Sequence, residues 1–142
     1  MAFYSLHTWR VPLRTKRWND ADDADDGFRL LVCRLRPRGV AKAREPWEAW
    51  WPELGPSREL LDAFHGKGRP APLPWDEYVP RYLEEMRAPG AVWRVRALAQ
   101  RVAAGDTVTL LCSSACVDAA RCHRSLLARL LTTVTDRDRD SP

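Results

Sequence analysis

Two short stretches of the chain carry side chains that could do chemistry. The first is LLVCRLRPRG, in which Arg34, Arg36 and Arg38 alternate with other residues, and no acidic residue lies anywhere in positions 28–44. A guanidinium group presents a planar fork that matches the oxygens of a phosphate or carboxylate, so this cluster predicts an anion-binding site. The structural alternative is that these arginines form ion pairs with distant acidic side chains, such as the acidic run at positions 20–26.

The second stretch is CSSACVDAARCHRS, which begins at Cys112. Cys112, Cys116, Cys122 and His123 are ligand types that zinc prefers, but their spacing is not that of a zinc finger or ribbon. If Cys122 and His123 lie on one helix, their side chains point about 100° apart and rarely reach the same ion. We therefore assign no metal site from the sequence. Cys122 lies beside His123 and Arg124, which favours a reactive thiolate, and an inert buried thiol is the alternative.

His123 also begins an apolar stripe with helical spacing. This position indicates either a core histidine with satisfied hydrogen bonds or a catalytic acid or base. Ser113, Arg124 and the amides of the loop add groups that favour an anion at the same place. The other members of the stripe are Leu126, Leu127, Leu130, Leu131 and Val134.

Hydrophobic patterning predicts the elements that position these side chains. Apolar runs at 28–35 and 107–113 are typical of buried parallel strands, and helical patterns lie between and after them. This alternation predicts an α/β fold, a single compact three-layer domain with a mainly parallel sheet flanked by helices, over residues 1–135, with a disordered tail at 136–142. Ligands bind beyond the carboxyl ends of such strands, so we expect the two stretches to enclose one pocket. The predicted helices span residues 57–64, 75–86, 91–103 and 118–134.

Length and composition narrow the class of protein. The chain has 142 residues, 45% of them hydrophobic, and a formal net charge of +4. No run approaches the roughly 20 apolar residues that span a bilayer, and the first residues lack the hydrophobic core of a secretory signal. We therefore expect a cytoplasmic protein with no membrane partner, whose four cysteines are thiols or ligands rather than disulfides.

Four blocks of the sequence resemble, in order and spacing, the YeaO-like branch of the domain of unknown function 488 (DUF488) family. They are DGFRLLVCRLRPRGVAK, WWPELGPSRELLDAFHG, WDEYVPRYLEEM and GDTVTLLCSS, and the resemblance covers residues 14–131. The segment CHRS is similar to the ending common in the broader family. The resemblance implies a compact α/β domain and supplies no established reaction. It carries the recurrent positions of the family over to Arg17, Gly27, Arg29, Arg34, Pro37, Arg38, Gly39, Lys42, Trp50, Pro56, Ser57, Phe64 and His65.

The sequence departs from this pattern at the end of the first predicted strand. Where the branch usually has aspartate before arginine, the chain has Cys33 before Arg34, and Arg36 stands where the branch usually has tryptophan. Loss of the carboxylate removes a base or a partner of Arg34 and makes the site more positive. Either the chemistry of the family is lost, or Cys33 serves as a nucleophile or soft metal ligand, for which haem iron is one candidate.

Three functions remain open, and no cofactor or oligomeric state is assigned. The first is an enzyme, or degenerate enzyme, whose partner is an anionic small molecule such as a nucleotide or phosphorylated metabolite. The second is a thiolate-ligated metal or haem protein that uses Cys33 or the C-terminal cysteines. The third, ranked below these, is a nucleic-acid-binding module, suggested by the basic stretch and a pI of about 9.1. The candidate catalytic residues are Cys33, Arg34, Cys122 and His123, and the candidate binding residues are Arg17, Arg36, Arg38, Gly39, Lys42, Ser57, His65, Cys112, Ser113 and Arg124.

Overall fold

A four-stranded parallel sheet forms the centre of the molecule. The computed structural model describes residues 13–140 and places the strands in the order β1-β4-β2-β3. Every neighbouring pair is parallel, so the carboxyl ends of the strands meet at one edge of the sheet. The strands are β1 (Leu13–Arg17), β2 (Phe28–Leu31), β3 (Ala49–Trp50) and β4 (Val108–Cys112).

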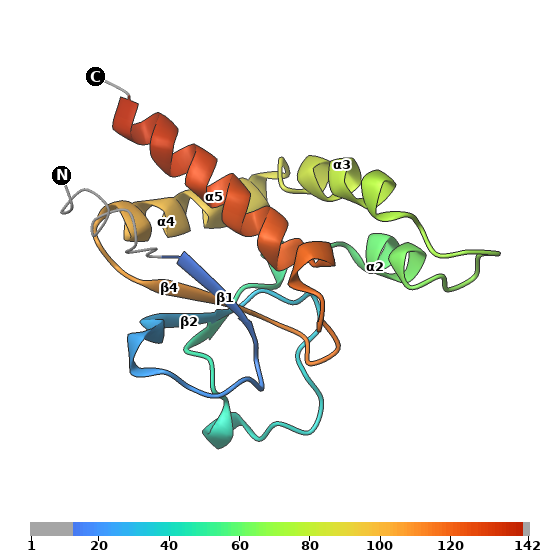
Figure 1. Cartoon of the computed structure of the whole chain (residues 1–142), viewed down its shortest axis with the longest axis horizontal. Coiled ribbons are helices and arrows are strands. Elements are labelled where there is room, and N and C mark those ends of the chain that lie inside the picture. Colours follow the sequence, from blue (N-terminus) through green and yellow to red (C-terminus); the bar gives the residue numbers. More distant parts are fainter. Residues whose placement is uncertain (1–12, 141–142) are drawn as a thin grey trace.

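Four α-helices lie on one side of this sheet (Figure 1). Three of them begin and end within two residues of the predicted positions, and Ser57 caps the first by accepting a hydrogen bond from the amide of Leu60. None of the helices in the described part of the chain is long and apolar enough to span a bilayer. The helices are α2 (Arg58–Phe64), α3 (Trp75–Glu85), α4 (Pro89–Ala103) and α5 (His123–Asp140), and four short 3-10 helices are η1 (Ala24–Asp26), η2 (Lys42–Arg44), η3 (Pro52–Leu54) and η4 (Ala119–Arg121).

The last helix differs from the prediction at both ends. The side chain of Asp118 accepts a hydrogen bond from the amide of Ala120 and so caps η4 rather than α5, which begins only at His123. At its other end α5 continues to Asp140, into the tail that was predicted to be disordered. No glycine or proline lies between Leu131 and Asp140 to break the helix, although the threonine and aspartate residues of this stretch are weak helix formers. Residues 141 and 142 lie outside the described residues.

The two faces of the sheet are covered in different ways. Leu30 and Leu110 are fully buried against the helices. Leu31 is buried on the other face, where the loop residues Trp18 and Trp47 pack edge to face with ring centroids 6.0 Å apart. The predicted α/β class with a parallel sheet and flanking helices is therefore confirmed, and the layer opposite the α-helices consists of loops and short 3-10 helices.

A buried carboxylate holds the loop between β1 and β2 to the sheet. Asp26 is 1% exposed, and its side chain accepts hydrogen bonds from Lys16, at 3.0 Å, and from the guanidinium of Arg29. Its backbone carbonyl accepts a third bond from the hydroxyl of Thr109, at 2.7 Å. The acidic run has the composition of a solvated loop, yet Asp26 forms buried ion pairs with Lys16 of β1 and Arg29 of β2. The bond from Thr109 ties the same residue to β4.

Replacing Asp26 with asparagine should destabilise the fold. The guanidinium of Arg29 would lose its buried partner and keep only the ion pair with the exposed Asp22, at 3.1 Å. Breaking a buried pair costs roughly 3–5 kcal/mol, and the remaining pair should hold the loss toward the lower end of that range. Urea unfolding of Asp26→Asn measures this loss. Asp25→Asn changes an exposed neighbour and should shift the free energy of unfolding by no more than about 0.5 kcal/mol. Equal stability of the two variants would contradict the assignment.

Acid should remove the same contribution. Burial would by itself raise the pKa of Asp26, but the hydrogen bond from Lys16 and the charges of Lys16 and Arg29 outweigh it, so the pKa lies below the ordinary value of 3.8. Since the folded-state pKa is the lower one, the stabilisation is fully present above about pH 4 and is lost as the pH falls through the folded-state pKa. The difference in unfolding free energy between wild type and Asp26→Asn should therefore be constant from pH 7 to about pH 5 and shrink in more acidic buffers.

Candidate functional site

The two stretches that carry the candidate residues meet at the carboxyl edge of the sheet, as the pattern of parallel strands predicted. They enclose one cavity of about 490 Å³, formed by the turn after β2, the helix α2 and the loop after β4. The cavity is lined by Cys33, Arg34, Leu35, Pro56, Arg58, Leu61, Asp62, Phe64, His65, Lys67, Cys112, Ser113, Ala115, Cys116, Val117, Asp118, Arg121 and His123.

The charged side chains that line this cavity are mostly basic. Arg34, Arg58, Lys67 and Arg121 outnumber its two acidic residues. One of these acids, Asp62, forms an ion pair with Lys67 at 3.7 Å, and the other is the residue that caps η4. An anion that enters the cavity therefore meets an excess of positive charge.

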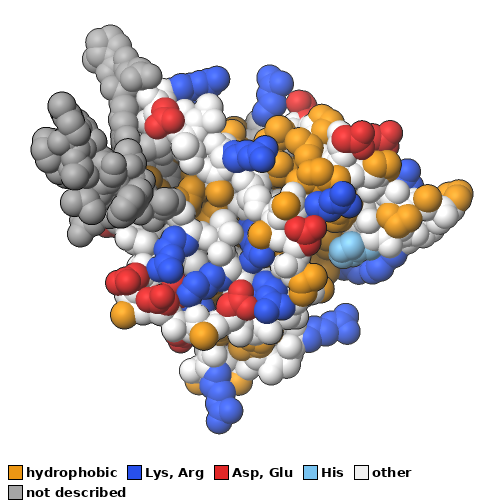
Figure 2. All heavy atoms as spheres, viewed as in Figure 1, with side chains coloured by type: hydrophobic (Ala, Val, Ile, Leu, Met, Phe, Trp, Pro, Cys, Tyr) orange, Lys and Arg blue, Asp and Glu red, His pale blue; other side chains and the backbone are white. Residues whose placement is uncertain are grey.

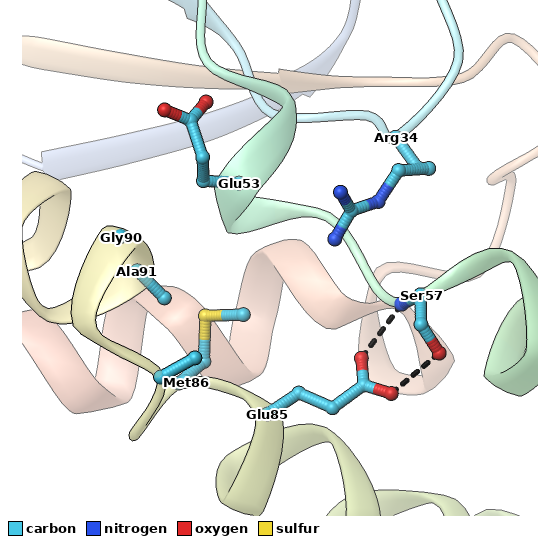
Figure 3. A pocket seen from close by; sticks show the side chains of 8 residues that line it. Arg34, Glu53, Ser57, Glu85, Met86, Gly90 and Ala91 are labelled. Carbon is cyan, nitrogen blue, oxygen red and sulfur yellow. Dashed lines mark hydrogen bonds between the residues drawn. The ribbon is translucent and has the colours of Figure 1, made fainter.

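Arg34 lines this cavity and a second one of about 330 Å³ (Figure 3). Its Nε and Nη2 atoms donate hydrogen bonds to the carbonyls of Pro56 and Gly55, both at 3.0 Å. Gly55 packs so closely that a Cβ atom there would lie 2.4 Å from the amide nitrogen of Arg34. The strand β2 ends at Leu31 rather than at position 35, so Arg34 stands in the turn and ties it to the segment that leads into α2.

Ser57, at the start of α2, has its hydrogen-bonding groups occupied. Its amide and hydroxyl donate to the carboxylate of Glu85, at 2.6 and 2.5 Å (Figure 3), while its hydroxyl also accepts from the amide of Leu60. The contacts of Ser57 therefore join α2 to α3. Ser57 does not line the larger cavity, whereas His65, at the other end of α2, does and is exposed.

The other basic candidates do not converge on the cavity. Arg36 pairs with Glu45 at 2.9 Å and lies over the ring of Trp47. This arginine therefore forms an ion pair within the protein, the alternative to anion binding, although its partner is Glu45 and not a member of the acidic run at 20–26. Arg17 pairs with Asp20 at 2.8 Å and donates to the carbonyl of Ser114 at 3.4 Å, which positions the loop after β4. The three remaining positions, Arg38, Gly39 and Lys42, are exposed and outside the cavity lining.

The four thiols gather around Cys112 at the end of β4. The Sγ atom of Cys112 lies 3.3 Å from that of Cys116, 3.4 Å from that of Cys122 and 3.9 Å from that of Cys33. All four are free thiols, as expected, and Cys116 is the only one that is half-buried rather than buried. Cys122 does not line the cavity, so its predicted direct role on a ligand has no geometric support.

Cys122 and His123 both approach the thiol of Cys112, contrary to the prediction from helical spacing. Cys122 adopts an extended conformation, with φ −132° and ψ 142°, because η4 ends before it and α5 begins after it. The Nδ1 atom of His123 lies 3.9 Å from the Sγ of Cys112 and 4.0 Å from that of Cys122. The expected separation of about 100° applies only on a continuous helix and is wrong for this pair.

One hydrogen bond fixes the orientation of the imidazole. The Nε2 atom of His123 lies 2.8 Å from the carbonyl oxygen of Val32, which can only accept. Nε2 therefore carries the hydrogen, and Nδ1 presents its lone pair to the thiols. Burial lowers the pKa of His123, which keeps the ring neutral. The expectation of a buried, satisfied histidine agrees with this arrangement, and the imidazole faces the thiols rather than a ligand.

Comparison with known proteins identifies the family. A family model described as "Active DUF488-N3 subclade" matches residues 13–135. The chain belongs to the DUF488 family. It is similar to the uncharacterized protein Rv3073c of Mycobacterium tuberculosis, with 34% identity over 119 residues, which cover 84% of this chain and 92% of that protein. It is also similar to the uncharacterized protein YeaO of Escherichia coli, with 44% identity over 55 residues, 39% of this chain and 48% of YeaO. No solved structure gives a significant match.

The two departures from the usual DUF488 pattern can now be placed. Cys33 is 7% exposed, lines the cavity and contacts Cys112, so a thiol stands where the branch usually has a carboxylate. Arg36 uses the position of the usual tryptophan to cover Trp47 and bind Glu45. The first departure changes the chemistry of the cavity, and the second changes only how the loop after β2 is held.

Cys116 was considered from the sequence only as a zinc-type ligand and was not among the candidate catalytic or binding residues, yet it lines the cavity. Hydrogen bonds from Cys112 and Cys122, with a smaller effect of the Arg124 charge, hold the pKa of Cys116 well below its ordinary value of 9.0. The same shared hydrogens raise the pKa values of Cys112 and Cys122. The available signal was the spacing of Cys116, four positions after a cysteine that ends a buried strand. Its partial exposure at the cavity wall could not be deduced from that spacing.

Arg124 is an unusual neighbour of this thiol. It is 5% exposed, and its Nη2 atom donates to the carbonyl of Cys116 at 3.2 Å. Its Nε and Nη1 atoms are buried and have no hydrogen-bond partner within the described part of the chain. Arg124 does not line the cavity. A buried guanidinium with two unsatisfied nitrogens favours negative charge close to it.

Cys116 should react first when the reduced, metal-free protein is treated with iodoacetamide. A thiolate at neutral pH makes the rate nearly independent of pH between about 6 and 8, whereas the rate of an ordinary thiol rises about tenfold per unit in this range. Peptide mapping by mass spectrometry measures the rate at each cysteine, and Cys116→Ser provides the control. Faster labelling of Cys33, or a tenfold rise per pH unit at Cys116, would contradict the arrangement described above.

Proposed function

We propose that this DUF488 protein is a small enzyme that binds an anionic small molecule, of the nucleotide or phosphorylated-metabolite class, in the 490 Å³ cavity. The observation that carries the proposal is the meeting of two segments about 80 positions apart at one cavity with basic and thiol side chains. A cavity of this size at the carboxyl edge of a parallel sheet is the usual place for a ligand in this class of fold.

Three cations are available to hold the anion. Arg58 and Arg121 are exposed and line the cavity, and Lys67 joins them beside its ion pair with Asp62. Arg34 has two of its nitrogens bound to backbone carbonyls, so it serves chiefly to position the turn around the ligand. Arg58 and Arg121 therefore contribute most of the affinity for the anion, and neither was among the candidates chosen from the sequence.

Thiols are the groups that could act on the bound molecule. Cys33 and Cys116 line the cavity, and a thiolate is the reactive form of cysteine in nucleophilic catalysis. His123 would influence the reaction through the thiols, because its Nε2 is occupied by Val32. The description of the matching family as an active subclade supports an enzyme over a purely binding role.

The nucleic-acid alternative has less support. On the face seen in Figure 2, basic side chains are scattered among acidic ones and do not form a continuous band. The basic stretch that suggested it is divided, because Arg36 is engaged by Glu45 and Arg34 is bound to backbone carbonyls, which leaves Arg38, Lys42 and Arg44 exposed on the loop. Nucleic-acid binding proteins usually follow the phosphate backbone with a patch or stripe of positive charge.

Calorimetric titration tests the proposal. The panel contains inorganic phosphate, nucleoside mono-, di- and triphosphates, and sugar phosphates, at low ionic strength. At least one should bind, and Arg58→Ala and Arg121→Ala should each weaken it by roughly tenfold, because a charged hydrogen bond contributes about 1.5–3 kcal/mol. Arg96→Ala removes an equal charge from an exposed position on α4 outside the cavity and should leave the affinity unchanged. No binding across the panel, or equal loss in all three variants, would reject it.

A further inference from the structure

Three sulfur atoms near the inner wall of the cavity are arranged for one metal ion. The Sγ atoms of Cys112, Cys116 and Cys122 all lie within 4.8 Å of one another, and two of the separations are 3.3 and 3.4 Å. In a tetrahedral zinc site each zinc–sulfur bond is about 2.3 Å, which places two sulfur ligands about 3.8 Å apart. The three thiols therefore need only small side-chain movements to share an ion.

The imidazole supplies a fourth ligand in the form that a metal requires. Nδ1 of His123 carries the free lone pair and lies 3.9 and 4.0 Å from the sulfurs of Cys112 and Cys122. Its other nitrogen is bound to the carbonyl of Val32. A metal-binding histidine almost always has this second bond, which sets the tautomer and the direction of the ring.

We propose that Cys112, Cys116, Cys122 and His123 form a zinc site of the three-cysteine, one-histidine type. Thiolates and imidazole suit Zn²⁺, whereas carboxylate and carbonyl oxygens suit Mg²⁺ and Ca²⁺. The inference goes beyond the proposed function, because it rests on thiols and imidazole and not on the cations that would hold an anion.

Arg124 provides an independent reason to expect negative charge at this place. Zn²⁺ with three thiolates and a neutral imidazole has one excess negative charge. The guanidinium of Arg124 is buried, bound to the backbone of Cys116 and otherwise unsatisfied at two nitrogens. The charge of Asp20 already acts on this guanidinium through space but leaves its Nε and Nη1 without hydrogen bonds in the described part of the chain, so an anionic metal centre would add negative charge where it is favourable.

Zinc would also tie the end of β4 to the start of α5. Its ligands come from the end of β4, the following loop and the first residue of α5, and His123 links them to β2 through Val32. Cys112, Cys116 and His123 line the cavity, so the ion would stand at the wall of the proposed ligand site. Cys33 contacts only Cys112 among the sulfurs and stays outside the group of three.

Cobalt titration of the full chain tests this site. The protein is kept reduced with a phosphine, since oxidation of Cys112 with either neighbour would destroy the site. Co²⁺ should produce thiolate-to-metal charge-transfer bands and the visible bands of a tetrahedral ion, and Zn²⁺ should abolish them at one equivalent. Bound zinc should also protect Cys116 from alkylation and raise the melting temperature.

Cys33→Ser is the matched control for the ligand variants. Loss of an outer partner of a metal site costs roughly 10- to 100-fold in affinity, and loss of a ligand should cost at least as much. Cys116→Ser and His123→Gln should therefore weaken Co²⁺ binding at least about tenfold. Cys33→Ser keeps a hydrogen-bond donor at 3.9 Å from the ligand Cys112, so it should weaken binding by much less than either ligand variant. Circular dichroism confirms that each variant is folded, and Cys116, being half-buried, is the substitution least apt to disturb the core.

Two outcomes would overturn the metal site. One is a reduced, folded wild type that shows neither tetrahedral cobalt bands nor a zinc-dependent rise in melting temperature. The other is an equal loss of affinity in Cys33→Ser and Cys116→Ser. The same experiments distinguish the metal site from the proposed function. Arg58→Ala and Arg121→Ala should keep full cobalt affinity. If the wild type binds cobalt but no member of the phosphate panel, the metal site stands and the proposed function is rejected.

Discussion

The hydrogen bond between Nε2 of His123 and the carbonyl of Val32 is the contact on which the arrangement of the site depends. It joins the first residue of α5 to the end of β2, and both residues are buried. Because the carbonyl can only accept, the bond also decides which imidazole nitrogen faces the thiols. One backbone acceptor thus fixes both the position of the imidazole and the nitrogen that carries its hydrogen. Cys112 and Cys122, at the two ends of the loop after β4, contact the other nitrogen.

The arginines that looked like a ligand cluster serve mostly to hold loops. Arg34 binds the carbonyls before α2, Arg36 binds Glu45, and Arg17 binds Asp20 and the loop after β4. These contacts shape the walls of the cavity, and the cations on its surface come from α2 and η4 instead. The positions of Arg17 and Arg34 can therefore be explained by loop geometry, whereas Arg58 and Arg121 lie exposed on the cavity wall.

The sequence predicted the parts of the fold that have a strong local signal. The apolar strands β2 and β4 and the three central helices were found, and the parallel arrangement correctly placed their carboxyl ends together. The strand β1 was missed because its sequence LRTKR is mostly polar, and β3 because it has only two residues. The interruption at Cys122 depends on Asp118 capping a different helix from the one expected, and the exposure of Cys116 depends on tertiary packing. No local pattern encodes either, so the thiol cluster could not be assembled from spacing.

The strand order has a consequence for how the chain is made. β4 is the last strand in the sequence, yet it lies between β1 and β2, which have no bonds to each other in the sheet. During synthesis on the ribosome, the strand that joins β1 to β2 is therefore missing until position 112 has emerged. β1 has no partner strand of this sheet while nearly a hundred further residues are translated. Cys112, Cys116 and Cys122 are also translated only at that late stage, so the thiol cluster cannot form before the last strand of the sheet is available.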